Sequence, residues 1–398
     1  MLKLSQRGAS APESPIRKLV PLADAARERG LHVFQLNIGQ PDIETPEVMR
    51  RGLKEYEDTV VSYGPSGGDA EFRKFLVEYY ASINVPLEAE NLVVTTGGSE
   101  AIVFALASCL DPGDQVLVPD PMYANYIGFG ALLGNQVVPI PTRVEEGYHL
   151  PENLDDFVTA QTRAIIVCNP ANPTGAVYGE AEIQRIVDLA LKHDLYIIAD
   201  EVYREFVYDG PIPASMLTYE AVKDRVVVVD SLSKRYSLCG GRLGCMVSGN
   251  KEIVKTAMKF AQARLSPPAL AQQLGARAGQ VPQSYFEDVR AEYKKRRDVV
   301  YEALASVDGV TVHRPEGAFY IMARLPVPDA EEFVRFMLND FELDGATTMV
   351  APGGGFYASP GMGVDEVRIA YVLNEGDLRR AMAVLVAALE VFPKRIAQ

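Results

Sequence analysis

The chain has 398 residues, which is more than one ordinary hydrophobic core needs and suits two domains. Hydrophobic residues make up 48% of it, and glycine and proline are dispersed, as is typical of a globular protein. The net charge of -14 and the lack of a basic run disfavour nucleic acid as a partner. No stretch has the apolar pattern of a signal peptide or of a membrane span. We therefore expect a cytoplasmic protein with no nucleic-acid or membrane partner.

The N-terminal part of the sequence predicts an arm followed by short elements. Residues 1–15 are mostly polar, and we expect them to lie as an arm. In Thr45-Pro46 the threonine is a capping residue and the proline suits the first position of a helix. Residues 63–68, Tyr-Gly-Pro-Ser-Gly-Gly, predict a flexible loop. The other elements expected here are a helix over 16–29, a strand over 33–38 and a helix over 70–83.

Short apolar runs alternate with helical segments through the middle of the chain. Strands are expected at 92–95, 115–118, 136–140, 164–168, 195–199 and 225–229, and helices at 100–110, 121–133 and 180–193. This alternation predicts an α/β fold, in which a mostly parallel sheet is covered by helices on both faces. Ligand sites on such sheets lie at the carboxyl ends of the strands.

The last part of the sequence predicts a smaller α+β domain, which the N-terminal segment is expected to join. A long helix over 283–305 is expected to link the two domains. Strands are expected at 310–313, 317–323, 347–350 and 367–370. The predicted division is an arm and part of the small domain at 1–46, a large domain at 47–285 and the small domain at 286–398.

The strongest chemical signal lies at residues 230–244, directly after the last strand predicted for the large domain. One lysine, Lys234, stands there among serines and glycines. Burial lowers the pKa of a lysine, and a neutral amine can attack a carbonyl group. The hydroxyls of Ser231 and Ser233 and the planar fork of Arg242 suit a phosphate. An amine beside a phosphate clamp indicates a covalently held phosphorylated aldehyde, pyridoxal phosphate (PLP), although a lysine on a surface turn would give the same local pattern.

Two other predicted strands also end in polar residues. Residues 169–175 are Asn-Pro-Ala-Asn-Pro-Thr-Gly, and residues 200–203 are Asp-Glu-Val-Tyr. Each has an ordinary explanation, because Asn-Pro and Pro-Thr-Gly form turns and aspartate often caps a helix. The four cysteines form no C-x-x-C pair, so we expect free buried thiols. The four histidines match no metal-binding spacing, and we expect no metal site.

Taken together, these motifs resemble the class I aminotransferases, which are PLP enzymes with the aspartate aminotransferase fold. The resemblance covers nearly the whole chain, from Gly39 to the C-terminal helices. It implies a large PLP-binding domain, with a mostly parallel seven-stranded sheet, and a smaller α+β domain. The motifs that carry it are Gly97-Gly-Ser99, Asn169-Pro-Ala-Asn-Pro-Thr-Gly175, Asp200-Glu-Val-Tyr203, Ser231-Leu-Ser-Lys234, Gly241-Arg242-Leu-Gly244 and Val367-Arg-Ile369.

The resemblance implies how the cofactor is held. Lys234 matches the lysine that binds the PLP aldehyde and moves a proton between the substrate carbon and the cofactor carbon. Asp200 matches the carboxylate that pairs with the protonated ring nitrogen and so makes PLP an electron sink. Asn172 and Tyr203 match the donors to the phenolic oxygen of the cofactor. Tyr123 matches the ring that stacks on PLP, where the best-known aspartate enzymes have a tryptophan.

The resemblance also implies a phosphate cup, part of it supplied by a second subunit. Backbone N–H groups at the start of a helix favour an anion, because they are unpaired and the helix dipole is positive there. Tyr63 matches a tyrosine that reaches the phosphate of the neighbouring subunit, which implies a homodimer with its sites at the interface. Within one chain, the cup would consist of Gly98, Ser99, Ser231, Ser233 and Arg242.

The substrate site implied by the resemblance contains an arginine and a glycine. Arg368 matches the arginine that binds the substrate α-carboxylate through two hydrogen bonds, and Gly39 matches a glycine whose backbone contacts the same group. The N-terminal segment is expected to close over this site. A donor with a second carboxylate needs another cation. Arg17 is the candidate, although an arginine on a solvated helix face would need no such role.

The implied activity is the transfer of an amino group from an L-amino acid to a 2-oxo acid. We expect 2-oxoglutarate as the acceptor and an aspartate-type donor, while alanine, aromatic and 2-aminoadipate donors stay open. A PLP-dependent carbon–sulfur β-lyase would use the same residues and would release pyruvate and ammonia without an acceptor. A PLP-binding regulatory module would carry a DNA-binding domain at its N-terminus, and the sequence shows no basic helix-turn-helix there.

Overall fold

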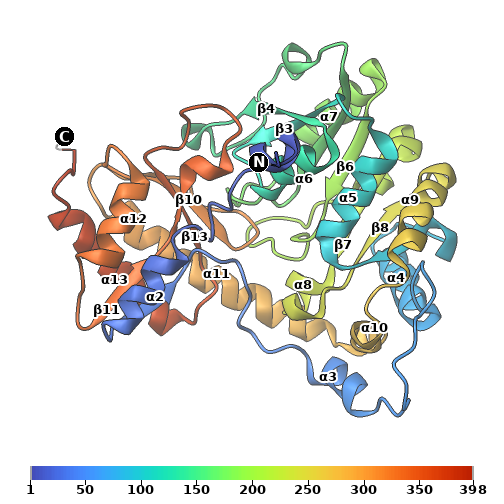
Figure 1. Cartoon of the computed structure of the whole chain (residues 1–398), viewed down its shortest axis with the longest axis horizontal. Helices are drawn as coiled ribbons and strands as arrows, with labels where there is room; N and C mark the ends of the chain where they lie inside the picture. Colours follow the sequence, from blue (N-terminus) through green and yellow to red (C-terminus); the bar gives the residue numbers. More distant parts are fainter. Residues whose placement is uncertain (1, 397–398) are drawn as a thin grey trace.

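A seven-stranded sheet forms the centre of the larger part of the molecule (Figure 1). The computed structural model describes residues 2–396. The strand order is β2-β8-β7-β6-β5-β3-β4, and β8 runs antiparallel to both of its neighbours while the other pairs are parallel. The strands are β2 (Leu92–Thr95), β3 (Gln115–Asp120), β4 (Gln136–Pro141), β5 (Thr162–Cys168), β6 (Tyr196–Asp200), β7 (Val226–Ser231) and β8 (Gly244–Ser248).

Helices cover this sheet on both faces, as the sequence predicted. Successive side chains of a strand point to opposite faces, so Val227 and Val229 of β7 pack in one core cluster and Val226 and Val228 in another. Both faces are apolar because both are covered, which explains the unbroken apolar runs of these strands. One face packs against α5 (Gly97–Cys109), α6 (Asn125–Leu133) and α9 (Lys251–Arg264), and the other against α4 (Ala70–Ser82), α7 (Glu180–His193) and α10 (Ala269–Gly275).

The smaller part of the molecule combines an N-terminal segment, residues 20–35, with the C-terminal part of the chain. Its four-stranded sheet has the order β12-β13-β10-β9, and β1 of the N-terminal segment pairs in parallel with β11 beside it. Phe34, Phe333 and Leu385 share its core. Its elements are α2 (Val20–Glu28), β1 (His32–Gln35), α11 (Gln283–Ala305), β9 (Thr311–Val312), β10 (Tyr320–Arg324), α12 (Ala330–Asn339), β11 (Ala346–Met349), β12 (Ala351–Pro352), β13 (Glu366–Ala370) and α13 (Glu375–Val391).

Helix α11 connects the two parts of the molecule. It runs without a break from Gln283 to Ala305, as predicted, and contacts α13 and β10. The predicted domain boundary, between residues 285 and 286, falls inside the first turn of this helix. The division at 1–46, 47–285 and 286–398 stays a prediction.

The ends of several elements differ from the sequence prediction. Thr45 does not cap a helix. Its hydroxyl donates to the Ser237 carbonyl, and Pro46 is the residue before α3 (Glu47–Lys54). The helix predicted over 121–133 begins only at Asn125, and the helix predicted over 100–110 begins earlier, at Gly97. Strand β8 was not predicted.

The expectation of buried thiols is correct for only two of the cysteines. All four are free, and Cys168 and Cys245 are buried. Cys109 and Cys239 are only half-buried, because Cys109 ends α5 and Cys239 faces a pocket. Among residues 2–396, no cluster of His, Cys, Asp and Glu side chains could hold a metal ion.

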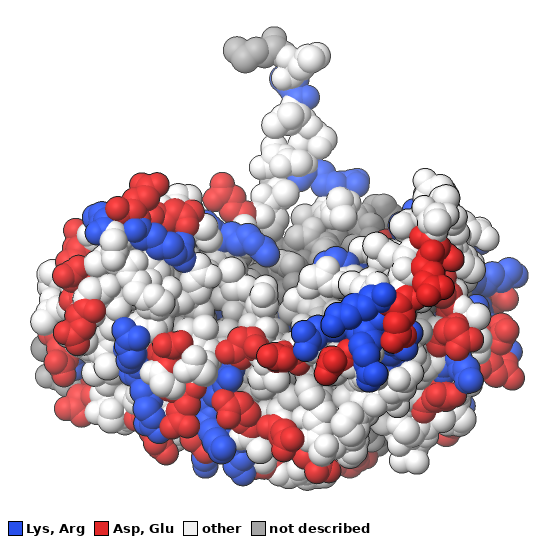
Figure 2. All heavy atoms as spheres, turned by 90° about the horizontal axis from the view of Figure 1, so that it is seen from below, with Lys and Arg blue, Asp and Glu red and all other residues white. Residues whose placement is uncertain are grey.

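The surface carries charges of both signs. Figure 2 shows Lys and Arg side chains interspersed with Asp and Glu on the face it presents. In the N-terminal segment, Leu2 and Leu4 are fully or largely exposed. It contains a short helix, α1 (Gln6–Ser10), that the sequence did not predict. Within the described residues, none of the helices has the length and apolar character needed to cross a membrane.

The start of α12 gives a test of local stability. The Asp329 carboxylate accepts hydrogen bonds from the backbone N–H groups of Glu331 (2.8 Å) and Glu332 (3.2 Å). Replacing such a cap by alanine costs about 1 kcal/mol, so we expect Asp329→Ala to lower the free energy of unfolding in urea by that amount. Asp340→Ala removes an exposed carboxylate at the other end of the same helix and should not destabilise it. Equal losses for the two variants would contradict the capping role.

Candidate active site

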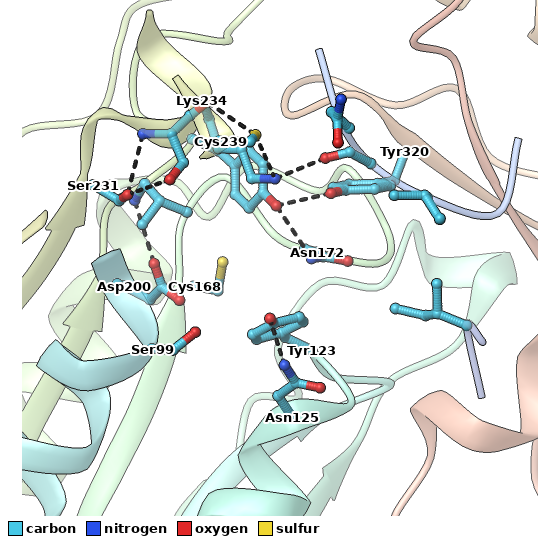
Figure 3. A pocket seen from close by; sticks show the side chains of 18 of the residues that line it. Ser99, Tyr123, Asn125, Cys168, Asn172, Asp200, Ser231, Lys234, Cys239 and Tyr320 are labelled. Carbon is cyan, nitrogen blue, oxygen red and sulfur yellow. Dashed lines mark hydrogen bonds between the residues drawn. The ribbon is translucent and has the colours of Figure 1, made fainter. Parts of the chain in front are cut away.

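One pocket of about 510 Å³ lies at the carboxyl ends of β5, β6 and β7, where the parallel sheet was expected to place a site. Every site residue predicted from the sequence lines it, apart from Tyr63. Figure 3 shows Lys234 and Tyr320 on one side of the pocket and Tyr123 and Asn125 on the other. The predicted residues in its lining are Arg17, Gly39, Gly98, Ser99, Tyr123, Asn172, Asp200, Tyr203, Ser231, Ser233, Lys234, Arg242 and Arg368.

Lys234 enters the pocket from a short helix, α8 (Leu232–Arg235), that directly follows β7. Ser231 caps this helix, because its hydroxyl oxygen accepts the backbone N–H of Ser233 at 3.1 Å. The cap fixes the direction in which the lysine leaves the sheet. Its Nζ donates to the carbonyl oxygen of Gly39 at 2.7 Å and lies 3.8 Å from the Cys239 sulfur. The lysine is half-buried.

An anion cradle lies at the first turn of α5. Gly98 and Ser99 bring backbone N–H groups that have no partner inside the helix. The Arg242 guanidinium closes the cradle: a Cβ at Gly97 would lie 2.7 Å from its nearest nitrogen. Gly97 also has a φ of +74°, so a side chain there would be both strained and obstructed. The close approach of Arg242 to the helix start therefore depends on glycine at position 97.

The hydroxyls of Ser231 and Ser233 meet beside this cradle. They are 2.9 Å apart, and both residues are buried. A Cβ at Gly244, in the neighbouring strand β8, would lie 2.9 Å from the backbone nitrogen of Gly98. The predicted phosphate-binding groups are thus brought together from three separate segments. The unpredicted strand β8 holds two of these segments against each other.

Asp200 is the last residue of β6 and its carboxylate is buried in the pocket wall. The Tyr126 hydroxyl donates to Oδ2 at 2.6 Å, and the backbone N–H of Val202 donates to Oδ1 at 3.3 Å. Burial raises the pKa of Asp200 to about 6, and these hydrogen bonds oppose that rise. The structure excludes the helix-capping explanation of this aspartate, because no helix begins in the residues that follow it.

A chain of hydrogen bonds joins Asn172 to two tyrosines. The Asn172 amide donates to the Tyr203 hydroxyl at 3.3 Å, and this hydroxyl lies 2.9 Å from that of Tyr320. All three residues are buried. Tyr320 was missed from the sequence. It is the first residue of β10. A Cβ at Gly39 would lie 1.9 Å from the Tyr320 hydroxyl, so the backbone of Gly39 can approach Tyr320 only because glycine has no side chain.

Arg368 of β13 is a buried cation without a carboxylate partner among the residues that the structure describes. Its two terminal nitrogens donate to the Asn37 carbonyl (2.6 Å) and to Oδ1 of Asn172 (3.3 Å), while Nε has no acceptor. The guanidinium lies 4.5 Å from the ring centre of Tyr320. Burial lowers the pKa of Arg368, and a buried charge normally needs a counter-charge. A carboxylate ligand would supply it.

The two remaining lining residues differ in burial. Tyr123 is half-buried, and its hydroxyl accepts a hydrogen bond from the Asn125 amide at 2.7 Å. Arg17 is exposed and lies in turns before α2, at the edge of the pocket, and its role stays a prediction. Burial raises the pKa of Tyr123 to about 12, and the positive charges of Arg368 and Arg17 oppose this rise. Arg17 is therefore close enough to act on the pocket electrostatically.

Tyr63 lies outside the pocket and 81% of it is exposed. Within one chain it therefore contributes nothing to the phosphate cradle. The segment around it precedes α4 and lies on the surface.

The sequence analysis missed Asn37, Asn125, Tyr126 and Tyr320. Tyr126 follows Tyr123 by three positions, which is a helical spacing, and this was the available signal. Tyr320 lies in a strand that was predicted. Phe319 and Tyr320 are adjacent in an apolar run, so the sequence does not indicate which of the two side chains points into the pocket.

The fold and pocket define an α/β enzyme in which a lysine, a carboxylate and an anion cradle meet at the carboxyl edge of the sheet. The sequence matches the family model for class I and II aminotransferases over residues 32–385. The chain belongs to this family. Its members use PLP, and the predicted family, fold, cofactor and aminotransferase activity are confirmed.

Relatives and solved structures agree with this assignment over nearly the full length. An aromatic-amino-acid aminotransferase 2 of Thermococcus litoralis is 32% identical over 391 residues, which cover 96% of this chain and 97% of the relative. An aspartate aminotransferase of Pyrococcus abyssi has the same identity and coverage. The structure of an aspartate aminotransferase from Thermus thermophilus with maleate has a TM-score of 0.88 and 28% identity, covering 98% of this chain and 100% of that one.

The residues present fit PLP. The unpaired N–H groups of α5 and Arg242 suit its phosphate, and the space they enclose exists only because Gly97 and Gly244 lack side chains. The buried Asp200 carboxylate suits a cationic ring nitrogen, and Lys234 supplies an amine within the same cavity.

The pKa of Asp200 predicts a pH dependence of cofactor binding. A carboxyl group with a pKa near 6 gains a proton as the pH falls below 6, and only its charged form attracts a cationic ring. We expect the dissociation constant of PLP, measured with the apoprotein, to rise by about tenfold for each pH unit below this pKa. Asp200→Asn should bind PLP more weakly and should lose this part of the pH dependence. The part that comes from other ionisations, such as that of the PLP phosphate, should remain. An unchanged profile in Asp200→Asn would contradict the assignment.

Proposed function

We propose that this protein transfers an amino group from an aspartate-type L-amino acid to 2-oxoglutarate, with each site residue in the role that the sequence predicted. The observation that carries the proposal is the placement of Arg368 in the same pocket as Lys234 and Asp200. A buried arginine that has no carboxylate partner in the described part of the chain favours an anionic ligand, and every amino acid and 2-oxo acid has a carboxylate.

The cofactor would be held at each of its polar groups. Lys234 would bind the aldehyde, Asp200 would pair with the ring nitrogen, and Asn172 and Tyr203 would face the phenolic oxygen. Tyr123 would lie against the ring. When bound, PLP supplies an acceptor for the electron pair that remains after the substrate carbon loses its proton. The phosphate would be held by Gly98, Ser99, Ser231, Ser233 and Arg242.

The chain itself supplies substrate orientation and proton transfer. Arg368 would bind the α-carboxylate through its terminal nitrogens, with the backbone of Gly39 on the same group. Once the substrate amine has displaced it, Lys234 would take the proton from the substrate carbon and deliver it to the cofactor carbon. Its short helix and the Ser231 cap hold the amine at a fixed position, which such a transfer needs.

The second carboxylate of the donor would bind Arg17. This arginine lies at the pocket and belongs to the N-terminal segment, which we propose closes over bound substrate. The backbone of this segment is held beside the pocket, because the amide of Asn37, which precedes the lining residue Ile38, donates to the Ile16 carbonyl at 2.8 Å. The names of the relatives include both aspartate and aromatic donors, so the test must compare them directly.

The test compares Arg17→Gln with the wild type on aspartate and on phenylalanine, both with 2-oxoglutarate. We expect kcat/KM for aspartate to fall about tenfold and that for phenylalanine to stay within twofold. Lys18→Gln is the matched control, since Lys18 pairs with Glu331 and not with the pocket. Equal losses on both donors would refute the role of Arg17. Release of a thiol, pyruvate and ammonia from a cysteine thioether, without an acceptor, would replace transamination by the β-lyase reaction.

We further propose that the protein is a cytoplasmic homodimer in which Tyr63 of the partner subunit reaches the phosphate. The exposure of Tyr63 is compatible with this role, and the sequence position of the tyrosine suggested it. Mixing Tyr63→Phe subunits with Lys234→Ala subunits tests it: a mixed dimer would hold one intact site and regain activity. No regain would show that both residues act within one chain.

A further inference from the structure

Tyr126 stands behind the pocket and contacts two of its functional residues. It lies in the first turn of α6, is 1% exposed and does not line the cavity. Its hydroxyl donates to Oδ2 of Asp200 at 2.6 Å. Its ring meets the ring of Tyr123 edge-on, with the centres 5.4 Å apart and the planes at 88°. One side chain therefore supports both the carboxylate below the expected ring nitrogen and the aromatic residue expected to lie on the cofactor.

The Tyr126 hydroxyl is the strongest fixed donor to Asp200 in the described part of the chain. The backbone N–H of Val202 is the other donor, at 3.3 Å and to the other oxygen. A hydrogen bond to a charged acceptor is about twice as strong as one between neutral groups, and the 2.6 Å distance is in the range for such bonds. Without the phenol, Oδ2 would be a buried oxygen with no hydrogen-bond donor.

The other charges near Asp200 do not replace this hydrogen bond. Asp230 at the end of β7 repels the carboxylate, while Lys234 on α8 attracts it only when protonated, and the cofactor would occupy this amine. The Cys168 thiol of β5 also faces Asp200 and is neutral while burial holds its pKa high. Burial disfavours the charged form as well. The phenol is thus the shorter of the two permanent hydrogen bonds that favour an ionised Asp200, the other being that of the Val202 N–H.

We propose that Tyr126 is a positioning residue that keeps the Asp200 carboxylate ionised and aimed at the cofactor ring nitrogen, so that the ring nitrogen carries the shared proton. The proposal rests on the proposed function of the same site. Tyr126 touches neither substrate nor cofactor. It acts through Asp200, and its ring holds Tyr123 at the required angle.

The test uses Tyr126→Phe, which removes the hydroxyl and keeps the ring contact with Tyr123. Holoenzyme reconstituted with PLP labelled at the ring nitrogen is followed by nitrogen NMR. We expect the resonance to move toward that of an unprotonated pyridine, and the dissociation constant of PLP to rise about 10- to 100-fold. The value of kcat should fall with it, whereas KM for the amino acid should change less than about threefold. Tyr293→Phe, which removes another buried hydroxyl without an acceptor, should match the wild type.

A second pair of variants separates positioning from packing. In an Asp200→Ala background the hydroxyl loses its carboxylate acceptor and keeps only the neighbouring Cys168 thiol, so adding Tyr126→Phe should change the PLP dissociation constant by less than about threefold. A full loss in that background would show that the phenol acts by packing and would refute the proposal, as would a Tyr126→Phe resonance like that of the wild type. If wild-type protein itself bound no PLP, the proposed function would fail first and the inference with it.

Discussion

The Lys234→Ala variant is expected to lose transamination almost completely, with kcat lower by about 10⁴-fold, the upper range for a positioned acid–base group. Lys234 is the one amine in the pocket, among the residues described, that can both bind an aldehyde and accept the substrate proton. Its loss removes the covalent attachment and the proton carrier together. The measurement is initial rate with saturating amino acid and 2-oxo acid, at PLP concentrations high enough to fill the site.

Two controls separate chemistry from folding in this experiment. Lys234→Arg keeps the positive charge and most of the length but cannot bind the aldehyde, so it should be as inactive as the alanine variant. Lys251→Ala removes an exposed lysine that pairs only with Glu88 at the surface, and it should retain full activity. A Lys234→Ala enzyme within tenfold of the wild type would exclude this residue from the reaction.

Arg368→Gln is expected to lower kcat/KM for the amino acid by about 10²- to 10³-fold, because truncating one member of a buried charge pair costs about 3–4 kcal/mol. The loss should appear mainly in KM, while the dissociation constant of PLP stays near its wild-type value. An amine that lacks the α-carboxylate gains nothing from the arginine. Its rate, already low in the wild type, should therefore not change in the variant.

The matched control for this prediction is Arg324→Gln. Arg324 lies on β10 of the same sheet but is partly exposed and pairs with Glu145. Its loss should leave kcat/KM unchanged. The carboxylate-binding role would be wrong if Arg368→Gln lost the same factor with the amine as with the amino acid, or if PLP affinity fell by a similar factor.

Much of the fold was predictable because the burial of the strands determines which residue types they contain. The centres of strands β5, β6 and β7 are buried on both faces and are therefore apolar runs that end where the polar site begins. Strand β8 was missed because Gly244–Ser248 contains one β-branched residue, and its pairing with β2 depends on contacts between segments far apart in the sequence.

The site was predictable where the residues themselves carry the chemistry. Lys234 and Asp200 stand at strand ends, where a polar residue after a buried run is informative. Tyr126 and Tyr320 could not be found in this way, because a tyrosine in an apolar segment has the same pattern whether it fills a core or supports a catalytic group. Their roles depend on 2.6 Å and 2.9 Å contacts to residues more than 70 positions away.

The most direct test of the account is the visible absorbance of the purified holoenzyme during a cycle of additions. We expect a PLP band that requires Lys234, disappears when aspartate is added alone and returns when 2-oxoglutarate follows. This sequence of changes would show that the pocket binds PLP through the lysine and passes an amino group from donor to acceptor. A protein that shows no such band after addition of PLP, with a spectrum identical to that of Lys234→Ala, would contradict the cofactor site and every role built on it.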